Sequence, residues 1–353
     1  MVVVAASRVF IIISSMRFTA AAAIAVTSIA AVSAFSSINR LSSGNSKRQH
    51  YSVPKEILES TTCECKEELI LAVQLALEAG KNMTKHYDSK GTADEDMSDL
   101  KINTKMNDAD FATAIDVENE DYISSAILKK FPDYDIIGEE STGTGTIPPL
   151  TNKPTFIIDP IDGTTNFASG LPLSCVSIGF CLNGKPNMGV VFAPMTNELY
   201  IGVKDHGAYR NGIRLLGCSG EKATKTLSHS VVNFEFGYAR DEEDVEKMAL
   251  AVKRLLQHGV RTTRTLGSGV LDLCYVACGR MDVVYTGIAA EGWKPWDYCA
   301  GLVIAVESGC TMSHLGASET DKSGYDFNLY SKSMICGVNA MVVDECRKCV
   351  MGL

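Results

Sequence analysis

Apolar residues recur along the chain with two periods, and the longer period predicts helices. From Glu64 to about Tyr87, apolar side chains such as Leu69 and Leu77 follow a 3.6-residue rhythm, which predicts an amphipathic helix. The same rhythm predicts a helix over Asp110 to Phe131 that ends before a proline. The polar stretch between these helices, residues 88–107, is predicted to be a loop.

Short apolar runs separated by turn residues predict strands in the middle of the chain. A short strand is predicted at Tyr134–Ile137, and the run that begins at Thr155 predicts a buried strand. The segments Leu173–Leu182, Met188–Ala193 and Glu198–Lys204 are predicted to form an antiparallel meander.

After residue 218 the pattern changes to helices that alternate with strands. Strands are expected near Ser230–Phe234, Arg261–Arg264 and Asp282–Thr286, and helices over Asp241–His258, over Val270–Cys278 and from Lys294 onward. We therefore expect an N-terminal α+β part over residues 60–217 and a C-terminal α/β part over residues 218–350, which together give an α/β fold class.

The buried strand at Thr155 leads into a dense group of oxygen ligands. Asp159 is expected at its end, and because Pro160 has no N–H, the strand cannot continue in register there and the chain is expected to turn. Asp159, Asp162, the Ile161 carbonyl and the hydroxyls of Thr164 and Thr165 then follow within seven residues. Such hard oxygen ligands suit Mg²⁺, Mn²⁺ or Ca²⁺ and not zinc. A turn in which both aspartates accept backbone N–H groups is the alternative.

The stretch Asp159-Pro-Ile-Asp-Gly-Thr-Thr-Asn166 resembles the first signature of the inositol monophosphatase family of metal-dependent phosphatases. Ile137-Gly-Glu-Glu-Ser141 and Trp296-Asp-Tyr-Cys-Ala-Gly301 match two further family stretches in the expected order, and Trp293-Lys-Pro-Trp-Asp297 resembles the plastid and bacterial branch. The resemblance implies an αβαβα sandwich of the inositol monophosphatase and fructose-1,6-bisphosphatase type, with metals in a cleft between its two parts.

The resemblance also implies two to three Mg²⁺ ions. Glu139, Asp159 and the Ile161 carbonyl are expected to hold the first ion, and Asp159, Asp162 and Asp297 the second, with Glu139 sharing a third through waters. Thr164 and Asp116 are expected to orient the attacking water. From the residues alone, Asp116 reads as an ordinary acid in the first turn of a helix.

Substrate-binding residues are expected around this centre. Ile161, Asp162, Gly163, Thr164 and Asp297 belong to it. The amides of Gly267, Ser268 and Gly269 are expected to approach phosphoryl oxygens at a helix start. The alternative there is a plain N-cap serine. The resemblance places Lys105 on a mobile loop near the metals. It makes Glu291 the candidate for a substrate hydroxyl in a loop longer than the family usually has; both could equally be ordinary loop residues.

The implied activity is hydrolysis of a small-molecule phosphate monoester, first myo-inositol monophosphate. Histidinol phosphate and sugar 1-phosphates are alternatives, whereas bisphosphate nucleotides and fructose 1,6-bisphosphate are disfavoured by the compact motif spacing. A regulatory subunit without activity would be expected to lack a metal ligand, and here all are present. The resemblance further implies inhibition by lithium and a homodimer.

The net charge bears on which macromolecules the protein can bind, and the cysteine spacing bears on zinc and redox roles. The chain has a formal charge of −9, and residues 1–55 hold six basic and no acidic residues, so the rest carries −15. Such a body is expected to repel nucleic acid and anionic membranes. The twelve cysteines include one C-x-x-C, Cys346–Cys349, without a histidine partner, which disfavours zinc but leaves a redox role possible there or at Cys63 and Cys65.

Residues 1–52 read as a targeting presequence. An apolar, alanine-rich stretch ends in Ala31-Val-Ser-Ala-Phe35, and a serine-rich basic segment without acids follows. Cleavage near Ala34/Phe35 and import into a plastid are expected, with a mitochondrial or secretory destination as alternatives. Once the presequence is removed, no stable membrane insertion is expected.

Overall fold

Two β-sheets organise the described part of the chain. The computed structural model describes residues 52–89, 91, 103–104, 111–217, 219–289, 292–316 and 324–353, which all belong to the unit Tyr51–Leu353. The seven-stranded sheet has the order β3-β4-β5-β6-β7-β8-β9, and only β3 and β4 run parallel. Its strands are β3 (Asp135–Gly138), β4 (Thr155–Asp162), β5 (Cys175–Leu182), β6 (Lys185–Ala193), β7 (Glu198–Val203), β8 (Gly207–Arg210) and β9 (Ile213–Arg214).

The five-stranded sheet has the order β11-β10-β12-β14-β13, with β11, β10 and β12 parallel and β14 antiparallel to both neighbours. Its strands are β10 (Val231–Glu235), β11 (Thr262–Arg264), β12 (Val283–Thr286), β13 (Thr311–Ser313) and β14 (Met334–Gly337). A separate pair joins β1 (Asn103–Thr104) to β2 (Phe111–Ala112).

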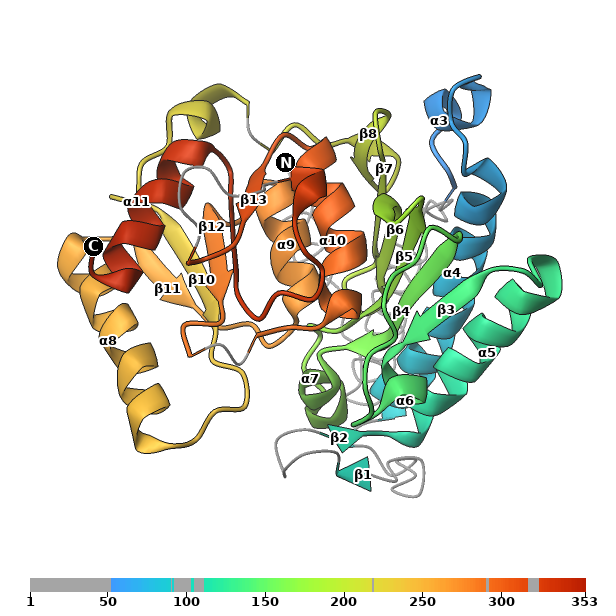
Figure 1. Cartoon of the computed structure of the whole chain (residues 1–353), viewed down its shortest axis with the longest axis horizontal. Helices are drawn as coiled ribbons and strands as arrows, with labels where there is room; N and C mark the ends of the chain where they lie inside the picture. Colours follow the sequence, from blue (N-terminus) through green and yellow to red (C-terminus); the bar gives the residue numbers. More distant parts are fainter. Residues whose placement is uncertain are drawn as a thin grey trace, which may run out of the picture. The chain divides into compact units, whose positions relative to one another are not determined.

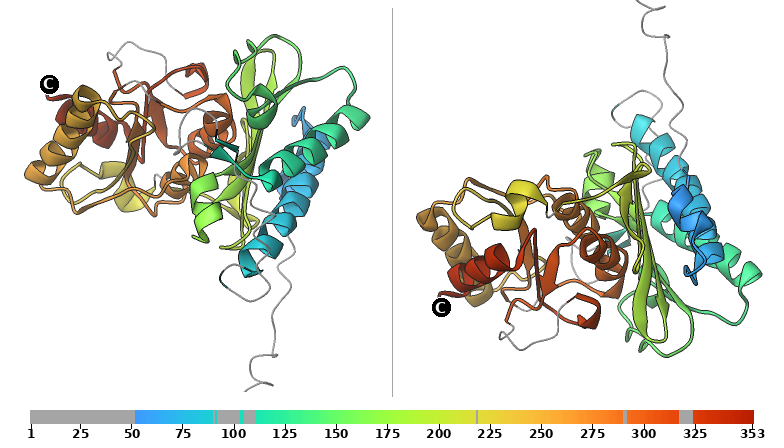
Figure 2. Two further views of the ribbon diagram at one scale, coloured as in Figure 1. Left: turned by 90° about the horizontal axis from the view of Figure 1, so that it is seen from below. Right: turned by 90° about the horizontal axis from the view of Figure 1, so that it is seen from above.

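Helices form three layers around these sheets, as Figures 1 and 2 show. Helices α4 and α5 cover one face of the seven-stranded sheet, α9 and α10 lie between the sheets, and α8 and α11 cover the far face of the five-stranded sheet. The α-helices are α3 (Lys55–Glu59), α4 (Lys66–Ser89), α5 (Ala114–Lys130), α6 (Glu139–Thr142), α7 (Thr164–Ser169), α8 (Glu242–His258), α9 (Gly269–Ala277), α10 (Pro295–Glu307) and α11 (Ala340–Met351), and two 3₁₀ turns are η1 (Gly220–Thr224) and η2 (Gly324–Asp326). The expected αβαβα sandwich is confirmed.

Strand β4 is buried along its whole length because both of its faces pack against helices. Phe156 and Ile158 belong to the core beneath α4 and α5, whereas Ile157 belongs to the core between the two sheets. An uninterrupted apolar run is what such a two-sided strand requires. The predicted loss of register at Pro160 is confirmed, but the strand does not end at Asp159. Strand β4 continues to Asp162 through a register shift against β5 between Asp159 and Asp162, and this bulge accommodates the missing N–H.

Helix α10 is seated in a row of glycines on the seven-stranded sheet. Gly179, Gly189 and Gly202 are direct cross-strand partners in β5, β6 and β7. A Cβ atom on Gly189 would lie 2.3 Å from the Ala300 carbonyl oxygen, and one on Gly202 would lie 2.8 Å from the Ile304 backbone. Only glycine allows this approach of helix and sheet, which fixes the position of the N-terminal end of α10.

Most sequence predictions of elements hold. The meander is confirmed, although β6 begins at Lys185, three residues before the expected Met188, and the helices over residues 66–89 and 242–258 start within two residues of their expected starts. The helix expected from Asp110 begins instead at Ala114, because residues 111–112 form β2 and Thr113 is the N-cap. The division at residue 218 and the 1–52 presequence stay predictions, and residues 1–51 lie outside the described part. Within the described part, every helix is too short or too polar to cross a lipid bilayer.

Candidate metal centre

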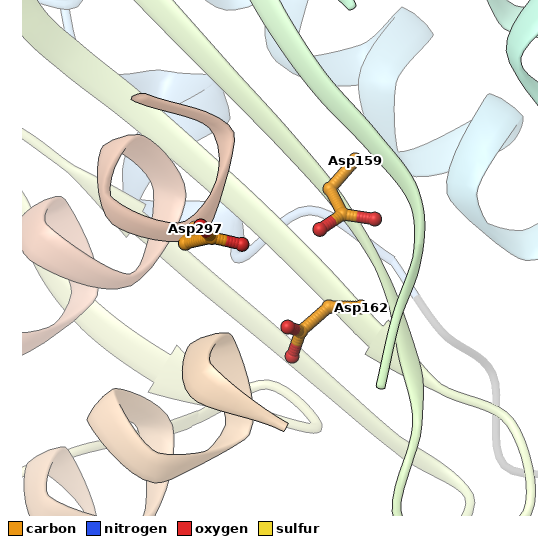
Figure 3. Close-up of side chains that lie close together, drawn as sticks. All are labelled: Asp159, Asp162 and Asp297. Atoms are coloured by element: carbon orange, nitrogen blue, oxygen red, sulfur yellow. The ribbon is translucent and has the colours of Figure 1, made fainter. Parts of the chain in front are cut away.

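Three aspartates from two distant segments converge in the cleft between the sheets. Asp159 and Asp162 lie at the C-terminal end of β4, and Asp297 lies in the first turn of α10. One carboxylate oxygen of each lies within 4.8 Å of those of the other two (Figure 3). The sequence predicted all three, and the structure brings them together.

The charges of these carboxylates oppose one another. Burial, followed by the charges of Glu139, Asp162 and Asp297, raises the pKa of Asp159 well above its usual range. Burial and the charge of Asp162 likewise raise the pKa of Asp297. Burial also raises the pKa of Asp162 to about 6, although hydrogen bonds from Ser268 and Val270 act in the opposite direction. A bound cation would offset this repulsion and favour the ionised forms.

The donor set fits hard divalent cations. Glu139 and Ile161 line the same cleft as the three aspartates, so four carboxylates and one backbone carbonyl border a single space. Oxygen-only donors of this kind suit Mg²⁺, whereas in the described part of the chain no cysteine or histidine joins the group. Glu139, Asp159, Ile161, Asp162 and Asp297 are therefore the residues that would hold Mg²⁺.

Glu139 is positioned by a second carboxylate that the sequence analysis missed. The buried side chain of Glu120, on α5, accepts hydrogen bonds from the amides of Glu140 and Ser141, both at 2.7 Å. These bonds hold the start of α6, where Glu139 is the first residue. Gly138 must lack a side chain, because a Cβ atom there would lie 2.4 Å from the Glu120 carboxylate. In the sequence Glu120 is an ordinary polar position of a helix, and no local motif marks it as a residue of the metal centre.

The start of helix α9 binds Asp162. The Gly269 and Val270 amides donate to its two carboxylate oxygens at 3.1 and 3.0 Å, and the Ser268 hydroxyl donates to it as well. The Gly267 amide donates instead to Glu235 at 2.9 Å. The helix N-terminus does approach an anion, but that anion is a carboxylate of the protein. The expectation that the Gly267 and Gly269 amides bind phosphoryl oxygens is therefore corrected.

Gly163 and Asn166 join the central motif to the segment before α9. Gly163 has φ +83°, and a Cβ atom there would lie 2.9 Å from the Leu173 carbonyl oxygen, so the sharp turn after β4 requires glycine. The Asn166 amide nitrogen donates to the carbonyls of Leu173 and Leu266 at 2.8 and 2.6 Å. These contacts fix Asp162 and α9 in one arrangement.

Thr164 connects the metal ligands to Asp116. Its hydroxyl oxygen lies 3.1 Å from the Ile161 carbonyl oxygen and 3.2 Å from Asp116 Oδ1. Asp116 is buried, and its Oδ2 accepts the Thr113 amide at 2.8 Å as part of the capping box of α5. Asp116 therefore caps α5 and also accepts a hydrogen bond from Thr164, while its expected role in orienting the attacking water stays a prediction.

The carboxylates line a cleft of about 460 Å³. That volume is typical of a site for a small molecule. The cleft is also lined by residues that the sequence did not mark as site residues, namely Glu235, Tyr238, Arg240, Trp293 and Lys294. Lys105 and Glu291 lie outside the described residues, so their expected roles stay predictions.

Comparisons with known proteins agree with this geometry. The model of the inositol monophosphatase family matches residues 65–344. Inositol monophosphatase 3 of Solanum lycopersicum is 35% identical over 282 residues, which is 78% of this chain and 93% of that protein. The inositol monophosphatase of Mesembryanthemum crystallinum is 37% identical over 237 residues, 67% of this chain and 82% of that protein. Among solved structures, the Thermotoga maritima IMPase superposes with a TM-score of 0.64 at 30% identity, covering 81% of this chain and 97% of that one.

Proposed function

The chain belongs to the inositol monophosphatase family, and we propose that it hydrolyses myo-inositol monophosphate to inositol and phosphate with Mg²⁺ as its cofactor. The observation that carries this proposal is the convergence of Asp159, Asp162 and Asp297 beside Glu139 and the Asp116–Thr164 pair. It combines a binding place for cations with a place to orient water. The named relatives are inositol monophosphatases.

Different residues of the chain have separate roles in the proposed reaction. When bound, Mg²⁺ lowers the pKa of water, offsets the charge of the phosphoryl group and stabilises the departing ester oxygen. Asp116 accepts a hydrogen bond from Thr164, which directs the hydroxyl of Thr164 and holds it beside the Ile161 carbonyl. A water hydrogen-bonded to Thr164 can pass its proton toward Asp116 as it attacks phosphorus. Occupancy by two to three Mg²⁺ ions is part of the proposal.

The substrate is tested with a panel of esters. We expect purified protein to release phosphate from myo-inositol 1-phosphate in Mg²⁺ and to release none in EDTA. Histidinol phosphate and galactose 1-phosphate are the alternatives of the same chemistry, because the loop around residues 287–294 differs from the family pattern. A higher kcat/KM on either alternative would keep the metal chemistry and replace inositol phosphate as the substrate.

A regulatory role without catalysis is the alternative from another class. It would predict a missing metal ligand, yet Asp159, Asp162 and Asp297 are present and gathered, and Glu139 lies at the same cleft.

We propose, in addition, inhibition by lithium, a small cation that competes at a site of this kind. Unchanged turnover in millimolar Li⁺ would contradict this part of the proposal.

We also propose a homodimer. Ile213 and Leu216, at the β9 edge of the seven-stranded sheet, are 71% and 66% exposed, and large exposed apolar side chains near one another favour association. Light scattering of the purified protein measures the mass. A monomer at micromolar concentration would contradict the proposal.

Import into a plastid rests on the sequence of residues 1–52 alone. We propose cleavage near Ala34/Phe35, with a mitochondrial or secretory destination as alternatives, and membership in the plastid and bacterial branch. The mass of the mature N-terminus in the native organism, together with imaging of a fusion to the full chain, distinguishes these destinations.

A further inference from the structure

Among the aromatic side chains that line the cleft, Trp293 is held in position by three contacts. Trp293 precedes α10 and is half-buried, so part of its ring packs into the protein and part borders the cleft. Its ring centroid lies 5.6 Å from that of the fully buried Tyr298 in a tilted arrangement. The indole therefore packs on the core of the inter-sheet layer.

The second contact of Trp293 is with Gly269, at the start of α9. A Cβ atom on Gly269 would lie 2.8 Å from Cε2 and Cζ2 of the indole ring. Even an alanine would therefore displace the ring. Gly269 is also the residue whose amide donates to Asp162. The glycine thus brings the tryptophan directly against the turn that holds a metal ligand.

The third constraint lies in the chain before Trp293. The Gly292 amide donates to the Lys332 carbonyl at 3.0 Å. Its Cα packs so closely there that a Cβ atom would lie 1.9 Å from that carbonyl oxygen. Gly287, before the loop, also packs against residues 332–333. Gly287 and Gly292 are therefore both held against residues 332–333, and the backbone that precedes Trp293 is fixed.

An aromatic side chain fixed at this place has a chemical consequence. The carboxylates account for the cations, and through them for the phosphoryl group, so the leaving alcohol must contact the other lining residues of the cleft, among them Trp293 and Tyr238. An aromatic face gains dispersion and apolar burial from a ring that presents a flat C–H face. A short open-chain alcohol cannot cover it.

We propose that Trp293, seated on Gly269, is the wall against which the leaving group packs, and that it makes the enzyme select cyclic alcohols over acyclic ones. This inference rests on the proposed phosphatase activity and names the substrate class of that same cleft.

The test compares a cyclic with an acyclic ester on the full chain in Mg²⁺. For Trp293→Ala and the bulkier Trp293→Leu, the KM of myo-inositol 1-phosphate is expected to rise about tenfold. The kcat/KM of glycerol 2-phosphate is expected to stay within about twofold. An equal fall in kcat/KM on both esters, or no fall on either, would overturn the proposal. Thermal unfolding shows which variants are folded.

The contact with Gly269 has its own readout. The chain holds two tryptophans, so Trp296→Phe leaves Trp293 as the sole tryptophan, whose fluorescence is excited selectively over that of the tyrosines. In that background Gly269→Ala is expected to shift the emission and to raise the KM of the cyclic ester. The matched control is Gly316→Ala, because a Cβ atom on Gly316 meets nothing within 4 Å. An unshifted spectrum with an unchanged KM would contradict the contact.

Failure of the proposed function gives a different result. If the wild-type chain hydrolyses galactose 1-phosphate and not inositol phosphate, the substrate proposal fails, and the wall is tested on the sugar ester. If it hydrolyses neither, myo-inositol 1-phosphate is titrated into the Trp296→Phe protein with Mg²⁺. Quenching of Trp293 would support the wall, and its absence would overturn it.

Discussion

The Thr164 hydroxyl oxygen lies 3.2 Å from Asp116 Oδ1, although the two residues are 48 positions apart. This contact joins the first turn of α5 to the motif that carries Asp159 and Asp162. In the proposed mechanism, this contact makes a helix-capping acid a partner of the reacting water. Proton transfer through such a pair typically contributes about 10²–10⁴-fold to a rate.

Asp116→Asn is therefore expected to lower kcat by about 10²–10⁴-fold, because the amide cannot accept a proton. The KM is expected to change little, since the metal ligands remain in place. Steady-state phosphate release measures both constants. Glu118→Gln, an exposed acid two residues further on α5, is the matched control and should retain full activity. A loss below threefold in Asp116→Asn would remove Asp116 from the mechanism.

Glu120→Gln is expected to weaken Mg²⁺ binding about 10–100-fold, as is typical when a residue that orients a metal ligand is changed. A glutamine offers one acceptor oxygen to the two amides that Glu120 now holds, so the start of α6 and Glu139 lose their fixed position. The Mg²⁺ concentration for half-maximal activity measures the effect. Asp121→Asn, exposed on the same helix, is the control. Equal Mg²⁺ dependence in both variants would contradict the positioning role.

Stability without metal is expected to fall as the pH rises through about 6. The pKa of Asp162 is about 6 in the folded protein against 3.8 for the free side chain, so the folded state binds more protons between these values. The stabilising effect is thus fully present below 3.8 and is lost as the pH passes 6. Raised pKa values of Asp159 and Asp297 act in the same direction.

Mg²⁺ should reverse this trend, because it binds the ionised carboxylates and offsets their repulsion. Thermal melts at pH 5 and 7.5, with Mg²⁺ and with EDTA, measure it. The increase in Tm caused by Mg²⁺ should be larger at pH 7.5. Ser268→Ala removes a hydrogen bond to the Asp162 carboxylate, so the transition should move to higher pH. An equal Tm increase at both pH values would argue against the carboxylates as the metal site.

Gly189→Ala is expected to destabilise the fold by about 1–3 kcal/mol or more, because the methyl group overlaps the Ala300 backbone and pushes α10 away from the sheet. Asp297 would move with the helix, so activity should fall together with Tm. Chemical denaturation gives the free energy of unfolding. Gly316→Ala, in open space, should leave it unchanged. A stable and active Gly189→Ala protein would show that α10 is not held by this row.

The sequence allowed the metal ligands and the layers to be predicted because local patterns determine both. Asp159 and Asp162 follow a buried strand, and Asp297 follows Pro295 at a helix start, so their motifs mark them directly. The two-sided burial of β4 was visible in its continuous apolar run. The missing N–H of Pro160 predicted the loss of register, whereas the continuation of the strand to Asp162 was not predicted, because it depends on the pairing of β4 with β5.

The missed residues act through contacts between distant segments. Glu120 reaches amides 20 and 21 residues away, and Glu235 reaches amides 31 and 32 residues away. No local pattern marks a buried helix glutamate as a cap for another helix. The Gly267–Gly269 segment shows the same limit, since the sequence indicated an anion at the start of α9 and only the fold identifies it as Asp162.

The proposed role of the gathered carboxylates, to hold Mg²⁺ for phosphate ester hydrolysis, is tested by measuring phosphate release from myo-inositol 1-phosphate. The wild-type chain and Asp297→Asn are compared across a series of Mg²⁺ concentrations. We expect Mg²⁺-dependent release by the wild type, none in EDTA, and at least a hundredfold loss in the variant (about 3 kcal/mol of transition-state stabilisation). Release that persists in EDTA, or an Asp297→Asn protein as active as the wild type, would contradict it.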